Sequence, residues 1–206
     1  MSLPVSTDVA FTPSVKALQE RKGSRRAYAA LEQRGGWRTV ITPELAEFIA
    51  AQTSVFLGTA SREGQPYIQH RGGPPGFLRV LDERTLGFAD FAGNRQYITL
   101  GNLAENSRFH LFLIDYAARR RIKIWGEARV VEHDAGLLAR LVPADYNARA
   151  EQAILLTVTA WDANCNRHIP QRFEAAEVAE ALRWRDERIA ELEEQLKRWQ
   201  AGSLFE

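Results

Sequence analysis

The chain of 206 residues has 45% hydrophobic and 26% charged residues, which is typical of a globular protein and excludes a disordered or collagenous chain. Its 27 Lys and Arg residues are balanced by 26 Asp and Glu residues, so the chain lacks the overall positive charge that would hold a nucleic acid. The single cysteine, Cys165, cannot form a disulfide within the chain, and no run of about 18 apolar residues is present to cross a membrane. We therefore expect a cytoplasmic protein with neither a classical export signal nor a nucleic-acid or membrane partner.

Residues 1–40 are expected to form an N-terminal helical arm. Its weak helical pattern is broken at Gly23 and ends at Gly35 and Gly36. A cluster of basic residues in this arm is more typical of a solvated face than of a nucleic-acid contact. The cluster consists of Arg21, Lys22, Arg25 and Arg26.

A short amphipathic helix is predicted to follow the arm. Thr42 has the side chain of a helix N-cap, Pro43 suits the first helical position, and Glu44 places an acid in the first turn. The apolar face of this helix consists of Leu45, Phe48 and Ile49.

From residue 54 onward, short β-type runs separated by turns recur at roughly ten-residue spacing, which is typical of an antiparallel barrel or sandwich. Helices are predicted between these runs, from about Asn94 to Glu105 and from the N-cap Asp134 to Leu141. The expected fold is mainly β with helices, and its barrel domain spans residues 41–173. The predicted strands are Ser54–Ala60, Tyr67–His70, Phe77–Leu81, Thr85–Phe91, Phe109–Asp115, Arg121–Val131 and Ala153–Trp161.

Residues 174–206 have the pattern of a C-terminal helix. Apolar residues follow the 4-3 spacing of a coiled coil over about three heptads, and Arg185 occupies one position of the apolar seam. This helix either pairs as a coiled coil or lies back on its own barrel. The apolar residues are Val178, Leu182, Ile189, Leu192, Leu196 and Trp199.

The stretch from His70 to Gly126 contains a concentration of arginines and places Asn94 at the predicted start of a helix. Guanidinium groups and the backbone amides at a helix N-terminus both suit a phosphate, so we expect a site for a small phosphorylated ligand. The alternative is that these arginines are scattered solubilising residues. Arg79 argues against it because Arg79 alternates with Leu78 and Val80 inside a predicted strand. The arginines considered for this site are Arg71, Arg79, Arg95, Arg119, Arg120 and Arg121.

Four segments of this stretch occur in a familiar order: Phe77–Asp82, Gly87–Gln96, Asn102–Asn106 and Arg121–Ala128. Together they resemble the pyridoxamine 5'-phosphate oxidase-like FMN-binding split-barrel family, over about residues 40 to 170. The resemblance implies an antiparallel six-stranded split β-barrel. It also implies a homodimer that holds FMN in two symmetric clefts at the subunit interface.

The resemblance also implies which residues hold the FMN phosphate. Arg79 stands where a phosphate-binding Lys is usual, and Arg95 stands where an Arg grips the same phosphate beside Asn94. Arg71 and Gln96 are expected to lie near them.

The sequence departs from the true oxidases at the flavin ring. Ala89 and Asp90 replace a Tyr-Thr pair that lies against the flavin, so this contact is expected to be remodelled around Asp90. Arg121 replaces a Gln, and a cation near the N1/O2 edge would stabilise the anionic reduced flavin. The alternative for Arg121 is a surface ion-pair residue.

The C-terminal part of the family pattern is only partly present. Trp161, Arg167 and Arg172 loosely resemble the run that contacts the cofactor and the phosphorylated substrate. Because the heptad helix replaces the longer C-terminal section of the true oxidases, specificity for vitamin B6 phosphates is not implied.

These observations predict an FMN-dependent oxidoreductase acting on a small molecule, with NADH or NADPH as a candidate reductant and no catalytic side chain. Two alternatives remain open, a non-catalytic flavin- or haem-binding sensor or storage module and a deazaflavin-dependent reductase. No metal site is expected, because the histidines and the cysteine lack metal-ligand spacing. These residues are His70, His110, His133, His168 and Cys165.

Overall fold

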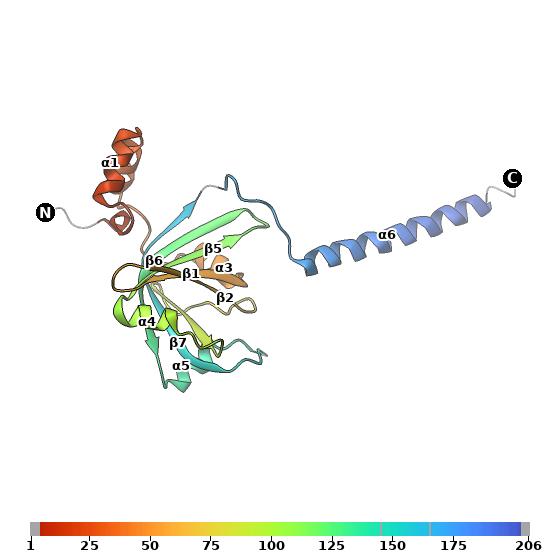
Figure 1. Ribbon diagram of the computed structural model, residues 1–206. Coiled ribbons are helices and arrows are strands. Elements are labelled where there is room, and N and C mark those ends of the chain that lie inside the picture. The colour runs from red at the N-terminus through yellow and green to blue at the C-terminus, as the bar shows by residue number, and fades with distance from the viewer. Residues whose placement is uncertain (1–4, 145, 165, 203–206) are drawn as a thin grey trace. The chain divides into compact units, whose positions relative to one another are not determined.

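The computed structural model describes residues 5–144, 146–164 and 166–202, and Cys165 therefore lies outside the described residues. The chain divides into two units by its internal contacts. The larger unit lies within residues 1–115 and 120–167, and it contains the N-terminal arm and the sheet (Figure 1). The smaller unit contains the turn Tyr116–Arg119 and the chain from His168 onward.

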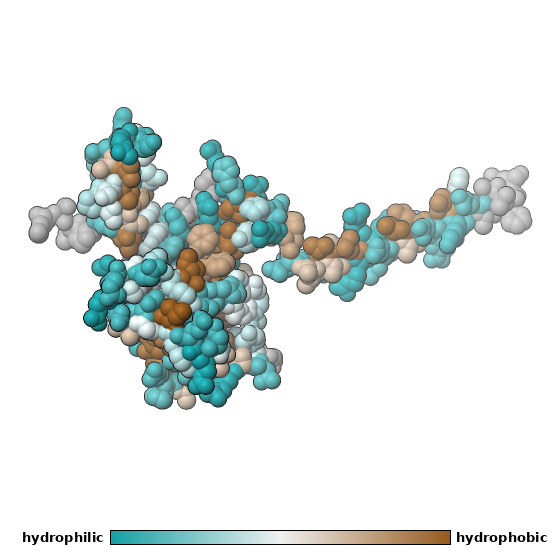
Figure 2. Space-filling view, in the orientation of Figure 1, coloured by the Kyte–Doolittle hydropathy of each residue, from teal (hydrophilic) through white to brown (hydrophobic). Residues whose placement is uncertain are grey.

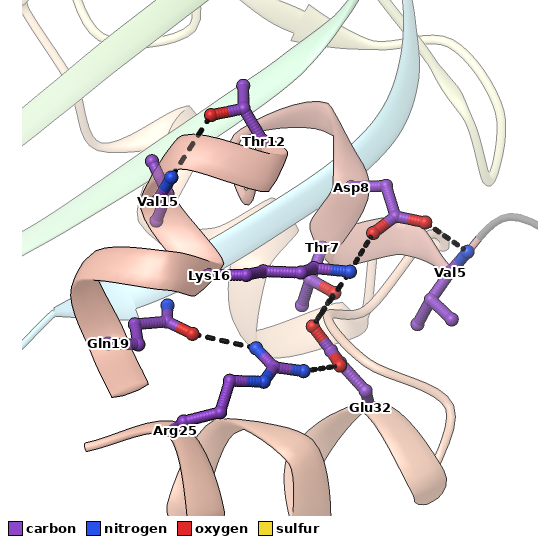
Figure 3. Close-up of polar contacts among 9 residues, drawn as sticks. All are labelled: Val5, Thr7, Asp8, Thr12, Val15, Lys16, Gln19, Arg25 and Glu32. Atoms are coloured by element: carbon purple, nitrogen blue, oxygen red, sulfur yellow. Dashed lines mark hydrogen bonds and ion pairs between the residues drawn. The ribbon is translucent and has the colours of Figure 1, made fainter. Parts of the chain in front are cut away.

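The N-terminal arm is helical, as predicted, and ion pairs hold its elements together (Figure 3). Lys16 lies 2.7 Å from Asp8 and 3.4 Å from Glu32, and Arg25 binds both Glu32 and Gln19. Arg25 is therefore part of an internal network rather than of a purely solvated face. The elements are η1 (Ser6–Val9), α1 (Pro13–Arg21) and α2 (Arg25–Gln33).

Aromatic stacking fixes the end of the arm against the sheet. The Trp37 ring stacks on Trp125 with centroids 4.7 Å apart and planes 6° from parallel, and Phe11 meets the edge of Trp37 at 5.0 Å. The Trp161 indole N–H donates to the carbonyl of Val40 at 2.9 Å. The connection between arm and sheet is therefore held by buried or half-buried rings.

Helix α3 (Pro43–Ala50) confirms the prediction from the capping pattern. The Thr42 hydroxyl accepts a hydrogen bond from the Leu45 N–H at 3.3 Å. The predicted apolar face is buried, because Leu45, Phe48 and Ile49 pack into the main core.

The strands form one antiparallel sheet with the order β2-β1-β5-β6-β7-β4-β3 (Figure 1). The expectation of six strands in a barrel is wrong in number, since the described residues form seven strands, and none of the pairings among them joins β2 to β3. The chain between these edges contains Pro74 and Pro75, which cannot donate to a sheet. The strands are β1 (Ser54–Ala60), β2 (Pro66–Gly72), β3 (Arg79–Val80), β4 (Thr85–Phe91), β5 (Arg108–Asp115), β6 (Arg120–Val131) and β7 (Ala150–Asn164).

The two long strands β6 and β7 join the halves of the sheet. β5 pairs with the first part of β6, and β4 pairs with the first part of β7. The register between β6 and β7 shifts at Trp125 and Gly126, which is a β-bulge. A Cβ atom at Gly126 would lie 1.9 Å from the carbonyl oxygen of Thr157, so the close approach of the strands requires glycine there.

The main core lies on one face of the strands, as the alternating pattern of apolar residues predicts. Side chains of β1, β5, β6 and β7 meet there under α3, and the fully buried ones include Leu57, Leu111, Leu113, Ile124 and Leu156. A second, smaller cluster forms where Leu141 of α5 (Ala135–Leu141) packs on Ala89, Ala153 and Leu155. The Asp134 carboxylate caps α5 as predicted, because it accepts from the Leu137 N–H at 2.8 Å.

His110 lies on the sheet face opposite the main core, with its ring 5.1 Å from that of Trp125. Its Nε2 atom is buried and has no hydrogen-bond partner among the residues that the structure describes. Burial lowers the pKa of His110, and the charge of Lys123 lowers it further. The neutral imidazole is therefore favoured at this position.

The smaller unit contains the predicted C-terminal helix, α6 (Ala175–Gly202). Within this unit, the Arg172 guanidinium lies 4.7 Å from the centre of the Tyr116 ring, and the Gln171 amide donates to the Ala117 carbonyl at 2.9 Å. Among the described helices, none combines the length and apolar character that a membrane crossing requires.

Candidate functional site

A pocket of about 340 Å³ lies where β2, the end of β4, the start of β7 and the loop before α4 (Ile98–Glu105) come together. The strand β2 contributes Tyr67, Gln69 and Arg71, whose side chains share one face because side chains alternate along a strand. The pocket therefore collects polar groups from four elements. The further polar side chains lining it are Asp90, Asn94, Arg95, Gln96, Tyr97, Thr99 and Glu151.

A buried carboxylate positions Arg71 in this pocket. Asp90 is only 7% exposed, and one of its oxygens binds Nη1 of Arg71. The other oxygen accepts a hydrogen bond of 2.9 Å from the Gln152 amide. The Arg71 guanidinium also lies 5.7 Å from the centre of the Phe88 ring, so both its charge and its flat face are held in place.

The Nε atom of Arg71 is buried but has no hydrogen-bond partner among the described residues. A buried donor without an acceptor costs about 1–3 kcal/mol, so such groups are rare in folded proteins. The unpaired N–H lies on a residue that lines the pocket, which indicates a ligand or water that supplies the missing acceptor.

The loop before α4 carries the second arginine of the pocket. Arg95 and Tyr97 both have left-handed backbones, with φ of 59° and 55°. The Arg95 Nε donates to the Tyr97 hydroxyl at 3.0 Å, and this bond, with the nearby charge of Glu151, raises the pKa of Arg95. The exposed guanidinium of Arg95 is therefore fully charged and is oriented by its neighbour.

The prediction that a helix begins at Asn94 is wrong, because α4 begins at Ile98. The Asn94 side chain instead accepts from the backbone N–H of Gln96 at 3.3 Å, which stabilises a turn. The left-handed residues at 95 and 97 also prevent helical hydrogen bonding. Asn94, Arg95 and Gln96 therefore approach the pocket from a loop rather than from a helix N-terminus.

The structure does not bring Arg79 and Arg95 together within one chain. Arg79 is exposed on β3 and lines a different hollow, beside Arg140 and Val142. Arg121 is half-buried on β6, paired with Ile114 of β5, and does not line the pocket of Arg95. Roles for Arg79 and Arg121 at a cofactor stay predictions.

Trp161 lies in another hollow, of about 590 Å³, between the arm and the sheet. Arg38 covers the face of Trp161 at 5.3 Å, and the hollow is also lined by Arg120 and Asp162. Burial raises the pKa of Asp162, although the nearby charge of Lys123 opposes this shift. This hollow is separate from the pocket that contains Arg71 and Arg95.

The predicted roles of Arg167 and Arg172 beside Trp161 stay predictions. Arg167 is exposed at the end of the larger unit, and Arg172 belongs to the smaller unit, where it contacts Tyr116. Within the larger unit, Arg167 does not line the pocket of Arg71 and Arg95.

Five polar residues of the pocket were not singled out in the sequence: Tyr67, Gln69, Tyr97, Thr99 and Glu151. The alternation of Tyr67 and Gln69 with Arg71 in a predicted strand was a usable signal for the first two. Glu151 reaches the pocket only because β7 pairs with β4, which no local pattern reveals. In the part of the chain that the structure describes, no group of three or more His, Cys, Asp and Glu side chains could hold a metal ion.

The open antiparallel sheet, its accompanying helices and a polar pocket at the strand ends define a mainly β protein. The pocket contains two arginines, Arg71 and Arg95, and two carboxylates, Asp90 and Glu151. A family model described as pyridoxamine 5'-phosphate oxidase matches residues 41–165. The chain belongs to this family. Among curated proteins, none matches the chain.

Solved structures with a similar fold come from several bacteria. HupZ of Group A Streptococcus is 16% identical, with a TM-score of 0.50 over 65% of this chain and 99% of that chain. An FMN-binding protein from Syntrophomonas wolfei is 14% identical, with a TM-score of 0.47 over 71% and 97% of the two chains. The heme storage protein HutZ from Vibrio cholerae is 14% identical, with a TM-score of 0.41 over 60% and 93%. At these identities, the similarity to HupZ supports the fold alone.

Proposed function

We propose that this protein binds FMN through the pocket of Arg71 and Arg95 and uses it as an oxidoreductase acting on a small molecule. The observation that carries the proposal is the buried, unpaired Nε of Arg71, in a pocket that also contains the oriented cation Arg95. Membership of the pyridoxamine 5'-phosphate oxidase family supports the choice of a flavin phosphate over other anions.

The residues of the pocket fit a phosphate monoester. Guanidinium and amide groups are good hydrogen-bond donors to phosphate oxygens. Arg71 and Arg95 supply the first kind of group, and Gln96 supplies the second. Two carboxylates also line the pocket, and each has a partner: Arg71 and Gln152 occupy both oxygens of Asp90, and Arg149 lies 3.6 Å from Glu151. Bound FMN would supply hydride exchange at its ring, while these residues would bind and orient its phosphate.

We also propose that a second copy of the chain completes the cofactor site. Arg79, Arg121 and Trp161 stand at positions that match the cofactor pattern of the family, yet none of them lines the pocket of Arg71 and Arg95 in one chain. A homodimer is the arrangement in which residues from two hollows can face one ligand.

Replacing Arg95 with alanine is expected to weaken FMN binding about tenfold or more, because one charge-assisted contact contributes about 1.5–3 kcal/mol. Riboflavin, which lacks the phosphate, should bind the native protein more weakly than FMN and should be insensitive to Arg95→Ala. Quenching of flavin fluorescence measures both affinities. Arg62→Ala, at an exposed turn outside the pocket, is the matched control. Equal binding of FMN and riboflavin by the native protein would remove the phosphate assignment.

The oxidoreductase part of the proposal is tested by the absorption spectrum of the purified protein reconstituted with FMN. A flavin spectrum that NADH or NADPH bleaches without oxygen, and that oxygen restores, is the expected result. If neither NADH nor NADPH changes the flavin spectrum, the protein binds FMN but lacks the proposed oxidoreductase activity with a nicotinamide. A Soret band in the protein as purified would instead favour haem.

A further inference from the structure

The helix α6 has an apolar stripe that no other described residue of the smaller unit covers. Every residue from 175 to 200 is exposed, including Leu182 at 50%, Leu196 at 53% and Trp199 at 71%. Figure 2 shows apolar residues recurring along the length of this helix. A helix of 28 residues with half-exposed leucines needs a partner surface, because most helical stability in proteins comes from the packing of an apolar face.

The stripe has the spacing of a coiled-coil seam. In heptad notation, Leu182, Ile189 and Leu196 occupy the a positions, and Val178, Leu192 and Trp199 occupy d positions. The central heptad, with Ile189 at a and Leu192 at d, has the combination that favours two-stranded parallel coils. We propose that α6 pairs with α6 of a second copy of this chain in a parallel, in-register coiled coil.

Flanking charges support the parallel direction. In a parallel pair, the g residue Arg188 lies beside the e residue Glu193 of the second copy, and symmetry repeats this attraction on the other side. An antiparallel pair would instead place e residues beside e residues, and the charged e residues are both acidic, Asp186 and Glu193. Arg188 also contacts Glu191 of its own helix at 2.7 Å, an exposed pair that leaves its other donors available.

The seam contains one charged residue, Arg185, at a d position. A polar residue in a seam reduces stability but fixes the register of the two helices. In the parallel, in-register arrangement, Arg185 faces Arg185 of the second copy across the seam, and the e residue Asp186 of the second copy lies beside each of them and offsets this repulsion in part. A one-heptad shift would place each Arg185 against an apolar residue, Leu192 or Val178, and would leave seam residues at both ends without a partner.

Disulfide formation in the full-length chain tests the pairing. In a background where Cys165 is replaced with serine, Leu192→Cys places a thiol in the seam, where the same residue of both copies comes within disulfide distance. Arg183→Cys places a thiol at a b position, on the outside of the pair. We expect mild oxidation to cross-link Leu192→Cys about tenfold or more faster than Arg183→Cys, since the seam raises the effective thiol concentration.

Charge exchange tests the direction and register. Adding Arg188→Glu to the Leu192→Cys chain should slow cross-linking about fivefold, because two exposed attractive pairs become repulsive. Adding Glu193→Arg as well should restore the rate. Far-UV circular dichroism should show an unchanged helix content in all variants.

Three outcomes would overturn the proposal. The first is equal cross-linking of Leu192→Cys and Arg183→Cys. The second is no cross-linking of Leu192→Cys, as expected if α6 covers its own barrel, pairs antiparallel or binds another protein. The third is a double variant that stays as slow as Arg188→Glu. FMN binding is expected to be the same in all these variants. A failure of the coiled-coil proposal would therefore not contradict the proposal that the protein binds FMN.

Discussion

Replacing Arg71 with alanine is expected to lower the free energy of unfolding by about 2–3 kcal/mol in the absence of cofactor. Removing one partner of a buried ion pair usually costs about 3–5 kcal/mol because the other charge is left unpaired. The lower value is expected here because the Arg71 side chain is 20% exposed and Gln152 still binds Asp90. Urea unfolding of the cofactor-free protein measures this change.

The same substitution should also weaken FMN binding about tenfold or more, through the loss of a charged donor. The double variant Arg71→Ala/Asp90→Asn separates the two effects. The neutral amide keeps the contact with Gln152 and removes the unpaired charge, so most of the stability should return while FMN affinity stays low. Native affinity in the double variant would show that Arg71 acts only as a partner of Asp90. Native stability of the single variant would show that the pair is not buried as described.

Replacing Gly126 with alanine is expected to destabilise the fold by about 3 kcal/mol or more. The new methyl group would meet the backbone oxygen of Thr157 at 1.9 Å and the Phe109 ring at 2.9 Å. No side-chain rotation relieves contact with a backbone atom, so β6 and β7 would have to separate at the bulge. Thermal and urea unfolding measure the effect.

Gly101→Ala is the matched control for Gly126→Ala. Gly101 lies inside α4, and a Cβ atom there would meet nothing within 4 Å. Because alanine is favoured over glycine in a helix by about 0.5–1 kcal/mol, this variant should be as stable as the native chain or more stable. A similar loss of stability in both variants would contradict the close approach at the bulge.

The sequence by itself determined the elements whose signals are local. Thr42 and Asp134 cap helices where the pattern predicts, and most strands fall within a few residues of the predicted runs. The heptad spacing defined α6 in the same way. Capping, alternation and helical spacing each depend on residues a few positions apart, so the sequence carries them directly. The concentration of arginines after His70 singled out Arg71 and Arg95 before the family resemblance did, and the structure places both in one pocket.

Only the tertiary structure decided which of these residues meet. Asp90 contacts Arg71 across 19 positions and Gln152 across 62, and both contacts depend on the register of strands that no local pattern specifies. The strained turn at Arg95 and Tyr97 moved the start of α4 from residue 94 to residue 98. Arg79 was directed away from Arg95 because β3 lies at a sheet edge, paired with β4 alone. Local sequence preferences determine each helix or strand separately. A pocket forms only when pairing between strands that are distant in the sequence brings several of these elements together.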